Sequence, residues 1–68
     1  MVNHPPHYTM GKIEVIDAIE DWNLDHHRAS AVAYIVRSPH KGTEVQDLEK
    51  AIWYLQRKVA QLKKSSAL

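Results

Sequence analysis

Histidine and tyrosine side chains near the start of the chain could contact a ligand. His4 and His7 lie three residues apart, and Tyr8 follows directly. Imidazole can bind a metal ion, transfer a proton or donate a hydrogen bond to a phosphate. No acidic or cysteine cluster stands nearby in the sequence, so we predict ligand contact and no metal site. The alternative is structural: this arm packs on a neighbour through proline and tyrosine.

Basic residues form a second candidate group, ahead of and within the last expected helix. Arg37 ends one expected helix, and Lys41 lies in the loop before the next. Helix amino ends attract anions, arginine offers a planar fork of donors, and lysine offers a compact charge. Lys50 is a further candidate for phosphate contact. The alternative is that all three are ordinary surface charges.

Two other pairs have simpler explanations. His26 and His27 open an expected helix and are explained as a packing or solvated pair. Glu14 and Asp17 lie one turn apart and could hold Mg²⁺, but a solvated helix face explains them better. The sequence has no G-x-x-x-x-G-K-[ST] loop and no recognisable nucleophile motif. Catalytic residues are therefore unknown, and the balance is against an enzyme.

Helices are expected to position these groups. Residues 1–11, which contain Pro5 and Pro6, predict an extended arm. The range 12–22 predicts a helix because its isoleucines recur at three-residue steps. A helical domain over 12–64 and a flexible tail over 65–68 complete the organisation.

Two more helices follow in the sequence. The second is expected over 25–37, with Asp25 as its cap, and Pro39 prevents its continuation. The third is expected over 43–64, where Thr43 and Gln46 have the spacing of a capping box. The fold class is therefore all-α.

The third helix carries an aliphatic seam at alternating spacings of three and four residues, which is a heptad pattern. We call these residues the seam: Val45, Leu48, Ile52, Leu55, Val59 and Leu62. A chain of 68 residues buries little surface on folding, so we predict that the seam and Trp53 meet another copy. The alternative is one long helix packed on two short ones within one subunit.

Composition limits the function classes. The chain has no cysteine, and its net charge is +1 with neutral histidines, which gives little attraction for nucleic acid. We expect no cofactor. No apolar run approaches a membrane span, and the first residues do not resemble a signal peptide, so we expect a cytoplasmic protein without a membrane partner.

Several blocks resemble the SaV-like family of small bacteriophage proteins of unknown function. The resemblance covers about residues 3–57. It rests on Asn3-His4-Pro5-Pro6-His7-Tyr8, Ile13-Glu14-Val15-Ile16-Asp17, Tyr34-Ile35-Val36-Arg37, Lys41-Gly42 and Asp47-Leu48-Glu49-Lys50-Ala51-Ile52-Trp53-Tyr54-Leu55. The family is also similar to a region of podophage nucleotide kinases that form large oligomers. The chain departs from the pattern at Ala29-Ser30 and Ala33, where members carry Gly-Asn and Lys, which favours binding over catalysis.

The resemblance implies an oligomeric phage accessory protein that acts in the cytoplasm of an infected bacterium. We expect it to bind a nucleotide or nucleotide-like anion at a subunit interface, and to modulate host nucleotide metabolism or defence signalling. The arm would cover the ligand, Arg37 and Lys41 would hold phosphate, and Tyr34 or Tyr54 would stack on a base. Replacing Arg37 with Ala is then expected to weaken binding without unfolding the chain.

Two other functions stay open from the sequence. One is inhibition of a host enzyme or defence complex by protein–protein contact, with Trp53 and Tyr54 as anchors. The other is a nucleotide kinase-like activity, which rests on the family resemblance alone.

Overall fold

The computed structural model describes residues 12–40 and 42–66, and all the regular structure within them is helical. Its elements are α1 (Val15–Asp21), α2 (His26–Arg37), the 3₁₀ turn η2 (Ser38–His40) and α3 (Glu44–Ser66). The predicted all-α class is therefore confirmed at the level of helix content. The predicted arm, residues 1–11, lies outside the described residues.

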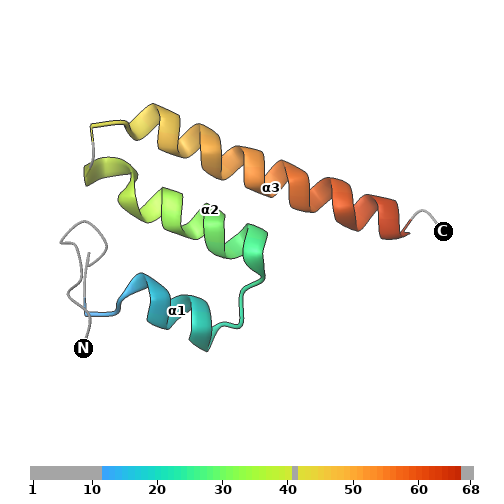
Figure 1. Ribbon diagram of the computed structural model, residues 1–68, viewed down its shortest axis with the longest axis horizontal. Coiled ribbons are helices and arrows are strands. Elements are labelled where there is room, and N and C mark those ends of the chain that lie inside the picture. Colours follow the sequence, from blue (N-terminus) through green and yellow to red (C-terminus); the bar gives the residue numbers. More distant parts are fainter. Residues whose placement is uncertain (1–11, 41, 67–68) are drawn as a thin grey trace.

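The three α-helices lie side by side in one layer, with α2 between α1 and α3 (Figure 1). The principal extents of the chain are 45 × 27 × 16 Å, so the molecule is flat. α2 packs along α3 as a helical hairpin, whereas its contact with α1 is much lighter. No described helix has the length and apolar character needed to cross a membrane.

α1 is shorter than the predicted range 12–22. It begins at Val15, because the backbone of Glu14 is still extended (ψ 150°), and it ends at Asp21. The turn after it requires a positive φ of 52° at Asn23, a conformation that asparagine tolerates better than most residues. The isoleucine row that indicated this helix does not form its inner face, since Ile13 and Ile16 are exposed. Trp22, at the next three-residue step after Ile19, is exposed as well.

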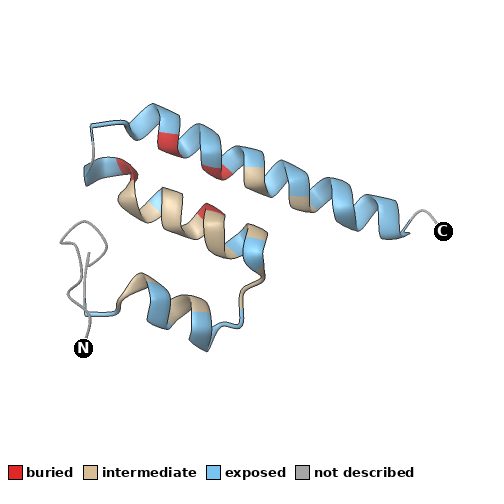
Figure 2. Ribbon diagram, viewed as in Figure 1, coloured by how far each residue is buried: buried red, intermediate tan, exposed pale blue. Residues whose placement is uncertain are grey.

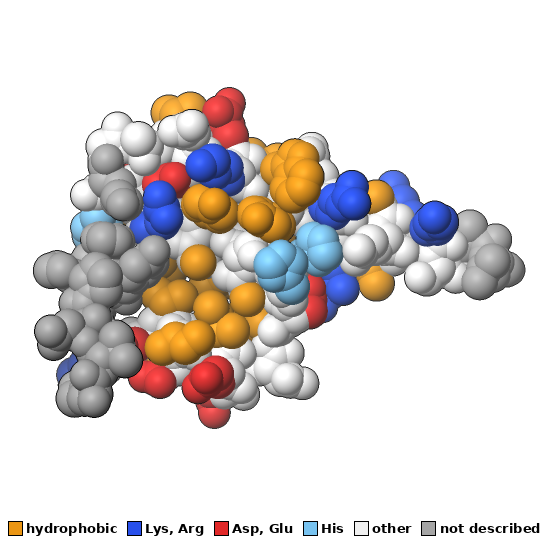
Figure 3. All heavy atoms as spheres, viewed as in Figure 1, with side chains coloured by type: hydrophobic (Ala, Val, Ile, Leu, Met, Phe, Trp, Pro, Cys, Tyr) orange, Lys and Arg blue, Asp and Glu red, His pale blue; other side chains and the backbone are white. Residues whose placement is uncertain are grey.

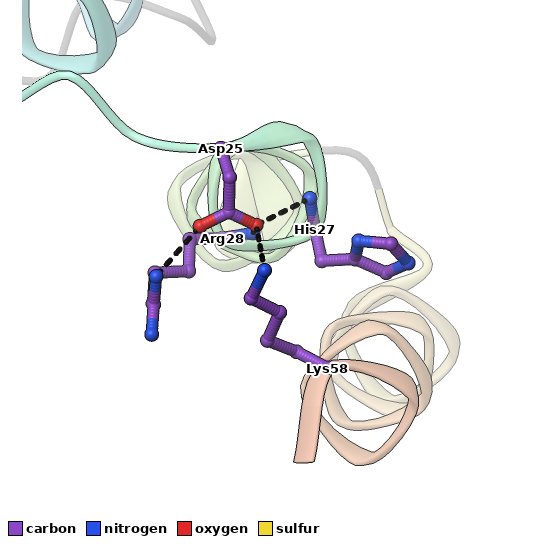
Figure 4. A network of polar contacts seen from close by, with 4 residues as sticks. All are labelled: Asp25, His27, Arg28 and Lys58. Carbon is purple, nitrogen blue, oxygen red and sulfur yellow. Dashed lines mark hydrogen bonds and ion pairs between the residues drawn. The ribbon is translucent and has the colours of Figure 1, made fainter. Parts of the chain in front are cut away.

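Asp25 caps α2, as predicted, and also ties α2 to α3 (Figure 4). Its carboxylate accepts hydrogen bonds from the backbone N–H groups of His27 (3.1 Å) and Arg28 (3.3 Å). The Arg28 guanidinium lies 2.8 Å away, and Lys58 Nζ reaches across from α3 to 3.5 Å. Partial burial raises the pKa of Asp25. The hydrogen bonds and charges of Arg28 and the charge of Lys58 outweigh that effect and lower the pKa from 3.8 to about 2.

A short turn connects α2 to α3. α2 ends at Arg37, before Pro39, and the buried Ser38 hydroxyl donates to the carbonyl of Ile35 (2.8 Å). Gly42 adopts a positive φ of 71° just ahead of α3. α3 begins one residue after Thr43, as the capping pattern predicts, and continues to Ser66, into the predicted tail.

Very little of the described chain is buried (Figure 2). Only Ala31 and Ala51 among its hydrophobic residues are buried, and these small side chains let α2 and α3 approach closely. The two buried polar residues are Ser38 and Asp47. The six seam residues are between 39% and 71% exposed. The first two helices therefore leave the seam uncovered within one chain.

Candidate functional site

Four of the predicted ligand contacts come together where α2 packs on the first half of α3. The rings of Tyr34 and Tyr54 stack at a centroid distance of 5.9 Å and an interplanar angle of 21°. The Arg37 guanidinium lies 5.3 Å from the centroid of Tyr34, and the Lys50 ammonium lies 5.4 Å from it. We call these four residues the cation–tyrosine cluster.

An open hollow lies beside this cluster. It has a volume of about 220 Å³ and is lined by Ser30, Ala33, Tyr34, Arg37 and Tyr54. Figure 3 shows one face of the molecule, where hydrophobic side chains gather over the middle, flanked by basic and histidine side chains. Sites that enclose a small ligand usually measure about 300–1,000 Å³. A ligand of that size would extend beyond this hollow, and a second surface would be needed to enclose it.

Arg37 is paired with the buried carboxylate of Asp47, a residue that the sequence does not indicate as part of the site. Asp47 is 1% exposed, and its Oδ2 atom lies 3.5 Å from Arg37 Nε. It also accepts a hydrogen bond from the Thr43 hydroxyl (3.2 Å). Arg37 Nε is buried and has no hydrogen-bond partner, so its contact with Asp47 is a charge interaction without good hydrogen-bond geometry.

A sequence signal for Asp47 does exist. Asp47, Ala51, Tyr54 and Lys58 follow one another at spacings of four, three and four, and they are the residues of α3 that are at least half-buried. This second stripe faces α2. It is less hydrophobic than the seam, so a search for hydrophobic periodicity finds the seam and not this stripe. A buried carboxylate on such a stripe indicates a cation on the facing helix, because an unpaired buried charge is costly.

Lys50 is the cation of the cluster that is most available to a ligand. Its side chain is exposed, and no described carboxylate lies within ion-pair distance of it. Arg37, by contrast, shares its charge with Asp47. Lys50 is therefore the better candidate for phosphate contact, a reversal of the order that the sequence indicates.

Tyr54 also joins a group of aromatic rings toward the start of α2. His26 and His27 contact its ring edge-on at centroid distances of 5.9 and 6.2 Å, and Trp53 lies 5.0 Å away. The two histidines also pack edge-on against each other at 5.4 Å. This geometry fits the packing pair that the sequence favours. It also leaves one side of Tyr54 committed to rings of its own chain.

The seam lies on the other side of α3 from the hollow. At about 100° per residue, Lys50 and the centre of the seam are roughly half a turn apart around the helix axis. The α2-facing stripe lies between them. Trp53, which the sequence groups with the seam, belongs to the side of Lys50 instead. A copy that packs on the seam would therefore not close the hollow.

The comparisons with known proteins identify a family. A family profile described as a protein of unknown function, DUF3310, matches residues 2–56, which is most of the chain. The protein belongs to the DUF3310 family. No curated protein and no solved structure matches it. The matched range contains the whole cation–tyrosine cluster, so the hollow lies within the part of the chain that defines this family.

The remaining predicted ligand contacts of this DUF3310 protein fall on residues whose positions the structure does not describe. His4, His7, Tyr8 and Lys41 lie outside the described residues. Within residues 12–40 and 42–66, no group of three or more His, Asp or Glu side chains is placed to hold a metal ion. The described groups of the cluster that could contact a ligand are two cations and two aromatic rings.

Proposed function

We propose that this protein binds a nucleotide or nucleotide-like anion at the cation–tyrosine cluster. The observation that supports this is the placement of two positive charges beside a pair of stacked tyrosines that border an open hollow. Lysine and arginine contact phosphate, and an aromatic face stacks on a base of any kind. A ligand that carries both groups uses both features of the cluster.

The division of work within the cluster follows from its charges. Lys50 meets the phosphate directly, and Arg37 contributes the part of its charge that Asp47 does not offset. Both cations lie over the Tyr34 ring, and the tyrosine pair is the surface that would contact the base. The hollow is too small to enclose a nucleotide, so a further surface completes it. The predicted arm with His4, His7 and Tyr8, which lies outside the described residues, or an additional copy would supply that surface.

The wider role comes from the resemblance to small phage proteins of the SaV-like family. On that basis we propose a phage accessory factor that modulates host nucleotide metabolism or sequesters a host defence signal. A kinase-like activity rests on the same resemblance, and no described residue adds to it.

The test is a binding measurement with two lysine variants. Lys50→Ala removes the exposed cation beside Tyr34, and Lys64→Ala removes the same charge from the last turn of α3, far from the hollow. Nucleoside mono-, di- and triphosphates are titrated by calorimetry, with inorganic phosphate for comparison. We expect Lys50→Ala to weaken nucleotide binding at least about tenfold, and Lys64→Ala to leave it nearly unchanged. Equal affinity of the two variants would remove Lys50 from the site.

Arg37→Ala is a poor probe of the same site. Removing Arg37 leaves the buried carboxylate of Asp47 without a cation, which costs about 3 kcal/mol of stability. The sequence-based expectation that this variant only weakens binding therefore overlooks the fold. A loss of binding in Arg37→Ala would not distinguish ligand contact from partial unfolding.

A second function is supported by a separate observation. Trp53 is 55% exposed, and the guanidinium of Arg57 lies 5.9 Å from its ring centroid. Tryptophan and arginine are the residues most enriched at the energetic centre of protein interfaces. Inhibition of a host enzyme would use this pair. Trp53→Ala would then abolish inhibition of that enzyme and leave nucleotide binding unchanged. If the variant still inhibited the enzyme, Trp53 would be excluded as an interface residue.

A further inference from the structure

We propose that two copies of the chain pair through the seams of their α3 helices, in antiparallel orientation. The starting point is the single layer of helices in Figure 1. Domains are normally built from two packed layers around a core, and the described residues bury only two hydrophobic side chains. A second layer must therefore come from elsewhere, and the seam is the surface that it would cover.

The seam is free to accept that layer. Its residues lie about 100° around α3 from the stripe that faces α2. All six are exposed, from Leu48 at 39% to Val45 at 71%. They extend from Val45 to Leu62, which is 18 residues or about 25 Å, and no polar residue occupies a seam position. A specific interface needs roughly 1,000 Å² of buried surface, so the pairing requires contact along the whole length of both seams.

The partner that covers the seam is a second copy of the chain, because two identical seams have complementary side-chain spacing. The spacing of three and four residues is that of a coiled coil, in which each side chain inserts between side chains of an identical or similar helix. A seam read backwards from Leu62 has the same spacing as one read forwards from Val45. Full overlap of two antiparallel seams places Val45 opposite Leu62, Leu48 opposite Val59, and Ile52 opposite Leu55.

The charges along α3 select the antiparallel orientation. Beside the seam, the first half of the helix carries Glu44 and Glu49, and the second half carries Lys58 and Lys63. A parallel pair would bring glutamates beside glutamates and lysines beside lysines. An antiparallel pair places each acidic half along a basic half, and it also opposes the two helix dipoles favourably. Lys58 additionally contacts Asp25 of its own chain, so Lys63 carries more of this effect.

Cysteine cross-linking tests the orientation directly, because the 68 residues contain no cysteine. Leu48→Cys and Val59→Cys are prepared separately and are oxidised alone and after mixing. In the antiparallel pair, position 48 lies about 16 Å along the axis from its own counterpart, too far for a disulfide. We expect a disulfide-linked dimer from the mixture and at most traces from either variant alone. Efficient cross-linking of Leu48→Cys with itself would overturn the antiparallel arrangement.

Oligomeric state tests the interface itself. Leu55→Glu introduces a charge at the middle of the seam, and Gln61→Glu introduces the same charge on the opposite side of α3, where the side chain is exposed. By sedimentation equilibrium, we expect Leu55→Glu to raise the dissociation constant of the dimer about thirtyfold or more. We expect little change for Gln61→Glu. Wild-type protein that stays monomeric at high concentration would end the proposal.

This inference does not depend on the proposed ligand. The cross-linking and sedimentation experiments contain no nucleotide, and the hollow lies on the other side of α3. Failure of nucleotide binding would leave the paired seams standing. Failure of pairing would leave the test with Lys50→Ala unaffected.

Discussion

At the scale of single residues, the most informative side chains are the ones that join α2 to α3. Arg37 and Asp47 connect the end of α2 to the first turns of α3, and Asp25 and Lys58 connect the start of α2 to the second half of α3. Each end of the hairpin thus has one ion pair, and Tyr54 lies between them among aromatic rings. The first of these pairs, Arg37 with Asp47, also forms part of the candidate site. A change at Arg37 therefore alters both chemistry and fold.

Asp25 gives an acid-dependent stability that can be separated from its role as a cap. Its pKa is lowered to about 2, so its ionic contribution is complete above about pH 4 and is lost as the pH falls through 2. Asn is an equally good cap but carries no charge. We expect Asp25→Asn to be less stable than wild type at pH 5, and the difference to shrink toward pH 2. Urea unfolding midpoints across this range provide the measurement, and a difference that stays constant with pH would contradict it.

At the scale of elements, the sequence predicts three helices and their order, but not every boundary. The ends of α2 are clear because Asp25 and Pro39 act through local chemistry. The start of α1 is placed three residues too early because Ile13 continues an apolar pattern that the backbone does not follow at Glu14. The sequence predicts Tyr34, Arg37, Lys50 and Tyr54, the four residues of the cluster, as ligand contacts. It does not predict Asp47, the carboxylate beneath Arg37, because a search for hydrophobic periodicity does not detect a buried carboxylate.

The turn before α3 tests how far one backbone conformation supports the hairpin. Gly42 has a positive φ of 71°, and a Cβ at this position would have no neighbour within 4 Å. The cost of Gly42→Ala is therefore one of backbone strain alone, about 1 kcal/mol. Gly42→Asn should cost less, since asparagine tolerates this conformation better. Thermal unfolding of both variants checks the order, and equal stability of the alanine variant and wild type would show that the turn rearranges.

At the scale of the whole molecule, one chain is a flat layer and leaves its longest apolar stripe exposed. The sequence predicts that stripe correctly, because a heptad pattern is visible without any structure. It could not show that the seam and the candidate site lie on opposite sides of α3, since that depends on which stripe α2 covers. A ligand site at a subunit interface stays a prediction, and the geometry indicates that a contact through the seam alone would not form it.

Paired seams make stability depend on protein concentration. Pairing favours the folded chain by mass action, so the unfolding temperature should rise by about 5 °C for each tenfold increase in concentration. Leu55→Glu should unfold at a lower temperature that no longer depends on concentration. Calorimetry over two decades of concentration provides the comparison, with Gln61→Glu as the control. A wild-type midpoint independent of concentration would argue for a chain that is stable alone.

The thinness of the layer has a consequence for the cell that makes this protein. If the seams pair as proposed, chains at low concentration would remain single. The described layer buries only two hydrophobic side chains, so a single chain would open readily to proteases. The amount of intact protein would then rise more steeply than its rate of synthesis. A gene expressed weakly would yield almost none of its product, and the same gene expressed in a burst would yield nearly all of it.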